Sequence, residues 1–236
     1  MRLRLPIKRS LLLASMLAFA LIALLPLRLA VGWFGFGERG LSARAATGSV
    51  WTGVLNEARF GPAALGDVSA RLHLLPLLAG RARLALAGTD PQAPFDGAVT
   101  ASRHGFGVDD VTGRFRIGGL ATALPIAAIE LRDVSAAFAR GRCVRAEGRV
   151  TAAAAGALAG LAPAFAGNAR CDGDALLVRL AGGSGMERID LGLFADGRYR
   201  VDLMVRTGDP AVRDRLLAAG LRPAAGGYAM RIAGAF

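Results

Sequence analysis

The chain has 236 residues, of which 53% are hydrophobic, so it is long enough to bury a core without metals or a dense set of disulfides. Its net charge of +11 at pH 7 is high enough to suggest a nucleic-acid partner. However, five basic residues lie in or beside an N-terminal segment without acidic residues, and the other arginines alternate with acids along strand-like segments. That pattern is typical of a solvated sheet face, so we predict that the protein binds no nucleic acid.

The first predicted element is a transmembrane anchor over residues 11–31, which begins with an apolar run at residues 11–27. At a rise of about 1.5 Å per residue the run is about 26 Å long, slightly less than a hydrocarbon core of roughly 30 Å. Arg28 can extend its side chain to the interface, which lets the next residues join the span. Aromatic residues follow the run, as expected at a membrane interface.

The charge around the apolar run predicts its direction. Four basic residues precede it, so residues 1–10 are expected to form a cytoplasmic tail and residues 32–236 to lie in the periplasm, giving a single-pass protein of the inner membrane. A cleaved signal peptide is the alternative. The run is longer than a usual signal core, and bulky aromatic residues rather than an Ala-x-Ala site follow it, which favours an uncleaved anchor.

Residues 32–236 are predicted to form one mainly β domain, because apolar and polar residues alternate repeatedly between turn residues. Strands separated by short turns indicate an antiparallel meander with one solvated face. The Ala- and Gly-rich residues 151–167 have a pattern that does not distinguish helix from loop. The predicted apolar strand faces are formed by Val68, Ala70, Leu72 and Leu74 up to Pro76; by Ala82, Leu84 and Leu86; by Gly113, Phe115 and Ile117; by Val134, Ala136 and Phe138; and by Val144, Ala146, Gly148 and Val150.

The clearest predicted unit is a hairpin around Asp196-Gly197, which is a strong signal for a tight turn. A one-residue slip would bury the arginines of both strands, so the register is well determined. The apolar residues on its two sides are Ile189, Leu191 and Leu193, and then Tyr199, Val201, Leu203 and Val205.

One short helix is predicted near the C-terminus. Asp209 can cap it, Pro210 fits its first position, and Gly220 can end it. Its apolar stripe consists of Val212, Leu216 and Ala219. A last strand is predicted from the alternation of Tyr228, Met230, Ile232 and Phe236.

Cys143 and Cys171 are the only cysteines, and each lies in a segment predicted as a strand or strand end. In an oxidising compartment such a pair is a candidate disulfide between neighbouring strands. Its ring would stabilise the fold by about 3–4 kcal/mol in the chain-entropy model. Two separate buried thiols are the alternative.

The sequence contains no convincing catalytic, metal or cofactor site. Residues 35–40 match the dinucleotide fingerprint G-x-G-x-x-G, but they follow the predicted span rather than a strand, and we interpret them as a linker. His73 and His104 have no partner at metal-ligand spacing. Asp109 and Asp110 could chelate a cation or act as paired carboxylates, but we interpret them as a turn pair. We therefore predict a protein that is not an enzyme and has no cofactor.

The order and spacing of several motifs resemble the type II secretion system protein N family (general secretory pathway protein N). That family has a Gly-x-Val-Trp-Ser/Thr-Gly strand just after its anchor, and Gly48, Val50, Trp51 and Gly53 match it. The resemblance covers almost the whole chain and is least specific at residues 151–167. Further similar segments are residues 40–44, 66–68 with 75–77, Cys143 with 169–176, and 226–228.

The resemblance implies an accessory inner-membrane component of the machine that exports folded periplasmic proteins across the outer membrane. Its implied partners are other subunits of that machine and membrane lipid, and it implies no catalytic residues. Edge strands of the sheet could take partner strands. Trp51 could anchor a partner, although we predict that it is a buried core residue.

Two alternative functions predict different features. A periplasmic lipid-binding or lipid-shuttling domain would require an apolar groove open to solvent. A sheet closed by the predicted helix at residues 209–220 would instead favour the interaction function. A periplasmic hydrolase is disfavoured because no nucleophile has a credible base.

Overall fold

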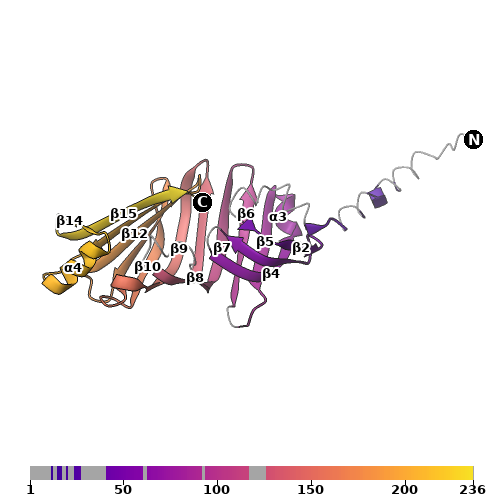
Figure 1. Ribbon diagram of the computed structural model, residues 1–236. Coiled ribbons are helices and arrows are strands. Elements are labelled where there is room, and N and C mark those ends of the chain that lie inside the picture. The colour runs from indigo at the N-terminus through magenta and orange to yellow at the C-terminus, as the bar shows by residue number, and fades with distance from the viewer. Residues whose placement is uncertain are drawn as a thin grey trace, which may run out of the picture.

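The computed structural model describes residues 12, 15–17, 20, 24–27, 41–60, 63–91, 94–116 and 126–235. In this part of the chain, fifteen strands form one antiparallel sheet, which Figure 1 shows as a long, twisted and curved array. The predicted mainly β meander is therefore confirmed. The strands are β1 (Leu41–Ser42), β2 (Ala45–Gly48), β3 (Gly53–Phe60), β4 (Ala63–His73), β5 (Arg81–Gly88), β6 (Phe95–Ser102), β7 (Gly105–Arg116), β8 (Ile126–Ala139), β9 (Arg142–Ala154), β10 (Ala164–Asp172), β11 (Ala175–Gly182), β12 (Glu187–Phe194), β13 (Arg198–Val205), β14 (Arg222–Ala224) and β15 (Gly227–Ala235).

The sheet follows chain order from β3 to β13 and departs from it only at its two ends. At the N-terminal end, β1 and β2 both pair with β3. At the C-terminal end, β15 lies between β13 and the very short β14. Because each long strand pairs with its sequence neighbours, most of the sheet is built from local hairpins.

The predicted hairpin is formed by β12 and β13, with Gly197 in the left-handed region at φ +83°. Ile189 lies opposite Leu203, and both are buried, as the alternation predicted. In the turn, Arg198 donates to the Asp196 carboxylate at 2.6 Å and holds the pKa of that carboxyl below its usual range. The register matches the prediction.

The predicted helix is α4 (Pro210–Ala218). The Asp209 side chain caps it by accepting a hydrogen bond from the Ala211 backbone N–H at 2.8 Å, and Gly220 follows it with φ +90°. Leu216 is fully buried, whereas the predicted stripe residue Ala219 is exposed. The stripe is therefore narrower than predicted, because α4 contacts the sheet mainly through one side chain.

The prediction for the end of β4 was wrong. The alternation that includes Val68 and Ala70 stops at His73, and a short helix, α3 (Leu74–Leu78), begins there. Pro76 therefore lies inside α3 and does not end the strand itself. Leu74, predicted on the buried face, is 60% exposed because the helical turn rotates it away from the sheet.

The prediction for the start of β9 was also partly wrong. Cys143 is buried and Val144 is 61% exposed, whereas Val150 lies on the buried face as predicted. A β-bulge explains the difference, because the β8–β9 register shifts between the pairs Ala137↔Arg145 and Phe138↔Cys143. The extra residue moves the preceding side chains to the opposite faces.

The Ala- and Gly-rich residues 151–167 combine three elements. They contain the end of β9, the 3₁₀ helix η1 (Gly156–Leu158) and the start of β10. Leu158 and Phe165 from this segment are fully buried in the core. The segment is therefore structured by packing, although its sequence has no clear period.

Two clusters of apolar side chains form the core. The C-terminal cluster combines side chains from β8 to β13 with Leu158 of η1 and Leu216 of α4. The N-terminal cluster combines side chains from β3 to β6 with Leu27. Burying each large side chain contributes about 1.5–3 kcal/mol, so these clusters hold the curved sheet in shape.

Most of the predicted anchor at residues 11–31 lies outside the described residues, as do the tail at residues 1–10 and Ile117. None of the helices within the described ranges is long and apolar enough to cross a membrane. Residues 25–27 contact the β domain: the Val50 backbone N–H donates to the Leu25 carbonyl at 3.0 Å, and Leu27 is 1% exposed. The anchor and its orientation stay predictions.

Candidate functional site

The two histidines lie on different elements of the sheet. His73 ends β4, and His104 lies in the turn between β6 and β7. Within the described ranges, no group of three or more His, Cys, Asp or Glu side chains could hold a metal ion. The dinucleotide-like motif at residues 35–40 lies outside those ranges.

Asp109 and Asp110 lie within β7, at a bulge, and not in the turn that we predicted. Asp109 is the more buried carboxylate, with a side chain 13% exposed, and it pairs with Arg83 at 3.0 Å and with Arg145. Asp110 has φ +53°, and its carboxylate accepts a hydrogen bond from the Ser135 hydroxyl at 3.3 Å. The two carboxylates thus join β5, β7, β8 and β9, which is a structural role.

This arrangement predicts unequal effects of two neighbouring substitutions. Asp109→Ala removes the more buried carboxylate that joins Arg83 to Arg145 and leaves each arginine only a longer contact, to Asp110 or Glu147, so we expect it to lower the free energy of unfolding by about 1–3 kcal/mol. Asp110→Asn, at a side chain that is 77% exposed, keeps a residue that tolerates φ +53° and an oxygen that can accept from Ser135, and it should change the free energy of unfolding by about 0.5 kcal/mol or less. Chemical denaturation of both variants checks this, and equal effects would contradict it.

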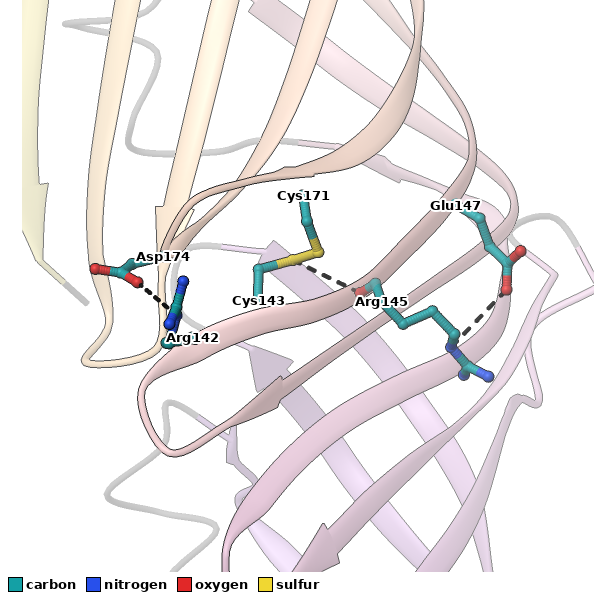
Figure 2. Close-up of a disulfide and its surroundings, with 6 residues drawn as sticks. All are labelled: Arg142, Cys143, Arg145, Glu147, Cys171 and Asp174. Atoms are coloured by element: carbon teal, nitrogen blue, oxygen red, sulfur yellow. Dashed lines mark hydrogen bonds and ion pairs between the residues drawn. A yellow bond between two sulfur atoms is a disulfide. The ribbon is translucent and has the colours of Figure 1, made fainter.

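Cys143 of β9 and Cys171 of β10 are joined by a disulfide, with their Cα atoms 5.5 Å apart. Figure 2 shows the bond between the two ribbons, with Arg145 and Glu147 farther along β9. The β9–β10 ladder ends at Arg149↔Asn168. Between this last pair and the disulfide, β9 contributes residues 143–149, whereas β10 contributes only residues 168–171. The segment of β9 is therefore longer than the segment of β10 that it faces. The disulfide therefore fixes an arch in β9.

Gly148 lies in the arch with φ +103°, and a Cβ at this position would lie 2.4 Å from the Asp133 carbonyl oxygen. Beside the arch is an open depression of about 500 Å³. Five of its eight lining residues are charged or polar and both charges are present, so it resembles neither an acyl-chain groove nor a single-charge binding site. The lining residues are Arg132, Asp133, Ala146, Glu147, Gly148, Arg149, Asn168 and Ala169.

The family motif forms the turn between β2 and β3. Gly48 has φ +84°, and a Cβ there would lie 2.6 Å from the Thr52 carbonyl oxygen. A Cβ on Gly53 would lie 2.5 Å from the Leu27 side chain. Val50 is 1% exposed. The motif is therefore a tight clamp around residues 25–27, and its glycines are required by the close backbone approach.

Trp51 lies at the tip of this turn and is half-buried, not fully buried as we predicted. Its neighbour Val50 enters the core instead. The alternation of a strand does not apply inside a turn, which explains the error.

The outer edge of β15 is the feature of the structure best suited to bind another chain. β13 pairs with β15 along its whole length, but β14 covers only Gly227, Tyr228 and Ala229. Along residues 230–235, no strand of the described chain pairs with the other edge. An open edge presents backbone donors and acceptors to a new strand.

This edge carries few of the devices that block edge pairing. Residues 230–235 contain no proline, and their one charged side chain, Arg231, pairs with Asp202 of β13. Ala233 and Ala235 on the outer face are small and exposed. A new strand can therefore approach closely.

The side chains around the edge define what such a strand would contain. On the inner face, Met230 and Ile232 are only partly buried against the C-terminal cluster. On the outer face, Arg231 is the edge residue of a row that continues through Asp202 to Asp190. A strand that alternates apolar and acidic residues would cover Met230 and Ile232 with its apolar side chains and place a carboxylate next to Arg231.

The charged row is itself well ordered. Asp190 accepts from Arg179 at 3.1 Å and from Arg188 at 3.0 Å. The hydrogen bond to the Asp190 side chain raises the pKa of Arg188 above its usual value. The sequence pattern predicts these strands but not the open edge, because whether an edge is exposed depends on the order of the strands in the sheet.

Two comparisons gave no similar protein, and one gave a family. No curated protein and no solved structure matches the chain. The family model described as type II secretion system (T2SS), protein N, matches residues 39–231, which is well over half of the chain. The match begins just before β1 and ends inside β15.

Proposed function

The chain belongs to the type II secretion system protein N family, and we propose that it is an accessory inner-membrane component of that machine, which supports export of folded periplasmic proteins through protein–protein contacts. A single N-terminal anchor would hold the β domain on the periplasmic side. The disulfide supports this location, because such bonds persist in oxidising compartments.

The open edge of β15 carries the proposal of a protein–protein role. It offers a long row of backbone groups next to partly buried apolar side chains, at the end of the sheet opposite β1 and β2. Strand addition at such an edge combines backbone hydrogen bonds for affinity with side-chain contacts for specificity. Other subunits of the secretion machine are the proposed partners.

The alternative of a lipid-binding groove has less support. In the described residues, Leu216 of α4 and Leu158 of η1 close the C-terminal cluster, and both are at most 1% exposed. The depression beside the β9 arch is lined by charged residues of both signs, with no large apolar side chain among them. These observations favour the interaction function.

The proposal predicts that the edge is required for export. A strain that lacks the gene should accumulate folded export substrates in its periplasm, and the wild-type chain should restore their export. A variant with Ala233→Glu and Ala235→Glu should fail to restore it, because the added carboxylates flank Arg231 on the outer face and repel the acidic side chains of the proposed partner strand.

The matched control places two glutamates at other exposed positions, Val144→Glu and Leu217→Glu, where the native side chains are 61% and 43% exposed. It should restore export. A photoreactive amino acid at Ala233 should also crosslink to another secretion subunit, whereas one at Val144 should not. Normal export in the deletion strain would refute the secretion role, and export by the edge variant would refute the role of β15.

A further inference from the structure

Helix α3 exposes three leucines to solvent. It lies between β4 and β5 and contains the sequence Leu-Leu-Pro-Leu-Leu. Leu74, Leu75 and Leu78 are 60%, 81% and 87% exposed, and α3 has no buried residue. Exposed aliphatic side chains gathered at one tip indicate a surface that is covered in the functional state.

This tip lies at the point where residues 24–27 reach the domain. The Val50 backbone N–H donates to the Leu25 carbonyl at 3.0 Å, and the Leu72 N–H donates to the Val50 carbonyl at 3.0 Å. Leu72 is followed almost immediately by α3. Figure 1 shows α3 near β2, at the end of the sheet where the chain enters. The exposed leucines therefore lie close to the end of the predicted anchor.

The surroundings of α3 are basic. Residues 68–89 contain no acidic residue. Arg81 begins β5 just after α3 and lies opposite Ser102 in the β5–β6 ladder. Ser102 is followed by the β6–β7 turn, which contains Arg103. The next turn on this side holds Arg140, whose backbone N–H donates to the His104 carbonyl at 2.9 Å.

Arg81, Arg103 and Arg140 are all exposed, and none of them pairs with a carboxylate in the described chain. One rim of the sheet thus combines an aliphatic tip with unpaired arginines. This composition fits a membrane surface, because leucines enter the boundary between headgroups and acyl chains while arginines contact lipid phosphates.

We propose that α3 is a second membrane contact, which inserts its leucines into the outer leaflet of the membrane that holds the anchor. The inference rests on the proposed membrane placement. A protein partner is less suited to this tip, because leucine is under-represented among residues that dominate protein–protein binding and α3 has no aromatic side chain. Two contacts, the anchor and α3, would fix the direction in which the sheet extends from the membrane.

The test uses the full chain in liposomes that contain anionic phospholipid. Leu75→Cys and Leu78→Cys variants are labelled with an environment-sensitive fluorophore; the native cysteines are bonded to each other and do not react. The control is Met186→Cys, at an exposed apolar residue between β11 and β12, which is 51% exposed. Lipids with a nitroxide near the headgroup should quench positions 75 and 78 but not 186, and aqueous iodide should give the opposite order.

Quenching at 75 and 78 that is no stronger than at 186 would overturn the proposal. Resistance of the protein to alkaline carbonate extraction reports the anchor separately. A chain that is extracted would refute the anchor, and with it the proposed placement. Export in the deletion strain is a third, independent measurement, so failure of the secretion role is distinguishable from failure of the α3 contact.

Discussion

Replacing Cys143 and Cys171 with alanine should lower the free energy of unfolding by about 3–4 kcal/mol. The disulfide closes a ring between residues separated by 28 positions, and a ring of this size lowers the entropy of the unfolded chain by about that amount in the chain-entropy model. For a domain of this size the change corresponds to a fall in Tm of roughly 10 °C. Thermal unfolding followed by circular dichroism measures it.

The loss should be concentrated at the β9 arch, because residues 143–148 have no ladder with β10 and are held by the β8 ladder, the Arg145–Asp109 ion pair and the disulfide. Hydrogen exchange in the double variant should accelerate first in this segment. Adding a reductant to the wild-type protein is the control and should give the same Tm as the double variant. Two free thiols in the wild-type protein, found by mass spectrometry under nonreducing conditions, would refute the bond.

Local patterns in the sequence were sufficient for most of the sheet. Asp196-Gly197 fixed the β12–β13 turn, and the alternation around Ile189 and Val201 fixed its register, because both signals act over a few residues. The errors at Leu74 and Val144 have the opposite cause. A helical turn and a bulge interrupt the alternation there, and neither has a distinctive local sequence.

The candidate interaction surfaces could not be predicted in the same way. The open edge of β15 exists because β14 is much shorter than its neighbour, which depends on the strand order at the end of the sheet. The exposed tip of α3 exists because a strand ends at His73, before its apolar run does. In both cases the residues are apolar or small, so the sequence alone suggests core positions.

The residue at which the anchor ends and the β domain begins is also determined by contacts in the fold, and hydropathy alone does not predict it. The sequence predicts one continuous apolar segment through Leu27, but Leu27 packs in the N-terminal cluster, and the clamp formed by Gly53 and Val50 closes around it. Leu24, three residues earlier, is 77% exposed. The boundary between anchor and domain is thus expected between these two leucines.

A pair of matched substitutions tests this boundary. Leu27→Ala should lower the free energy of unfolding of the β domain by about 2–5 kcal/mol, because it leaves a cavity beside Leu55 and Val68. Leu24→Ala removes the same atoms from an exposed side chain and should change it by about 0.5 kcal/mol or less. Thermal unfolding of the full chain in detergent micelles compares the two.

If the membrane span included Leu27, both leucines would contact detergent or lipid, and the two variants would have the same Tm. A lower Tm for Leu27→Ala alone would mean that the last residues of the apolar run belong to the β domain. In that case the contact between residues 25–27 and the turn at residues 48–53 would tie the end of the anchor to β2 and β3, and a force or a movement at the anchor would be transmitted through this contact to the sheet. The clamp motif at residues 48–53 would then have a mechanical role, which explains why it requires two glycines and a buried valine in a turn that carries no catalytic group.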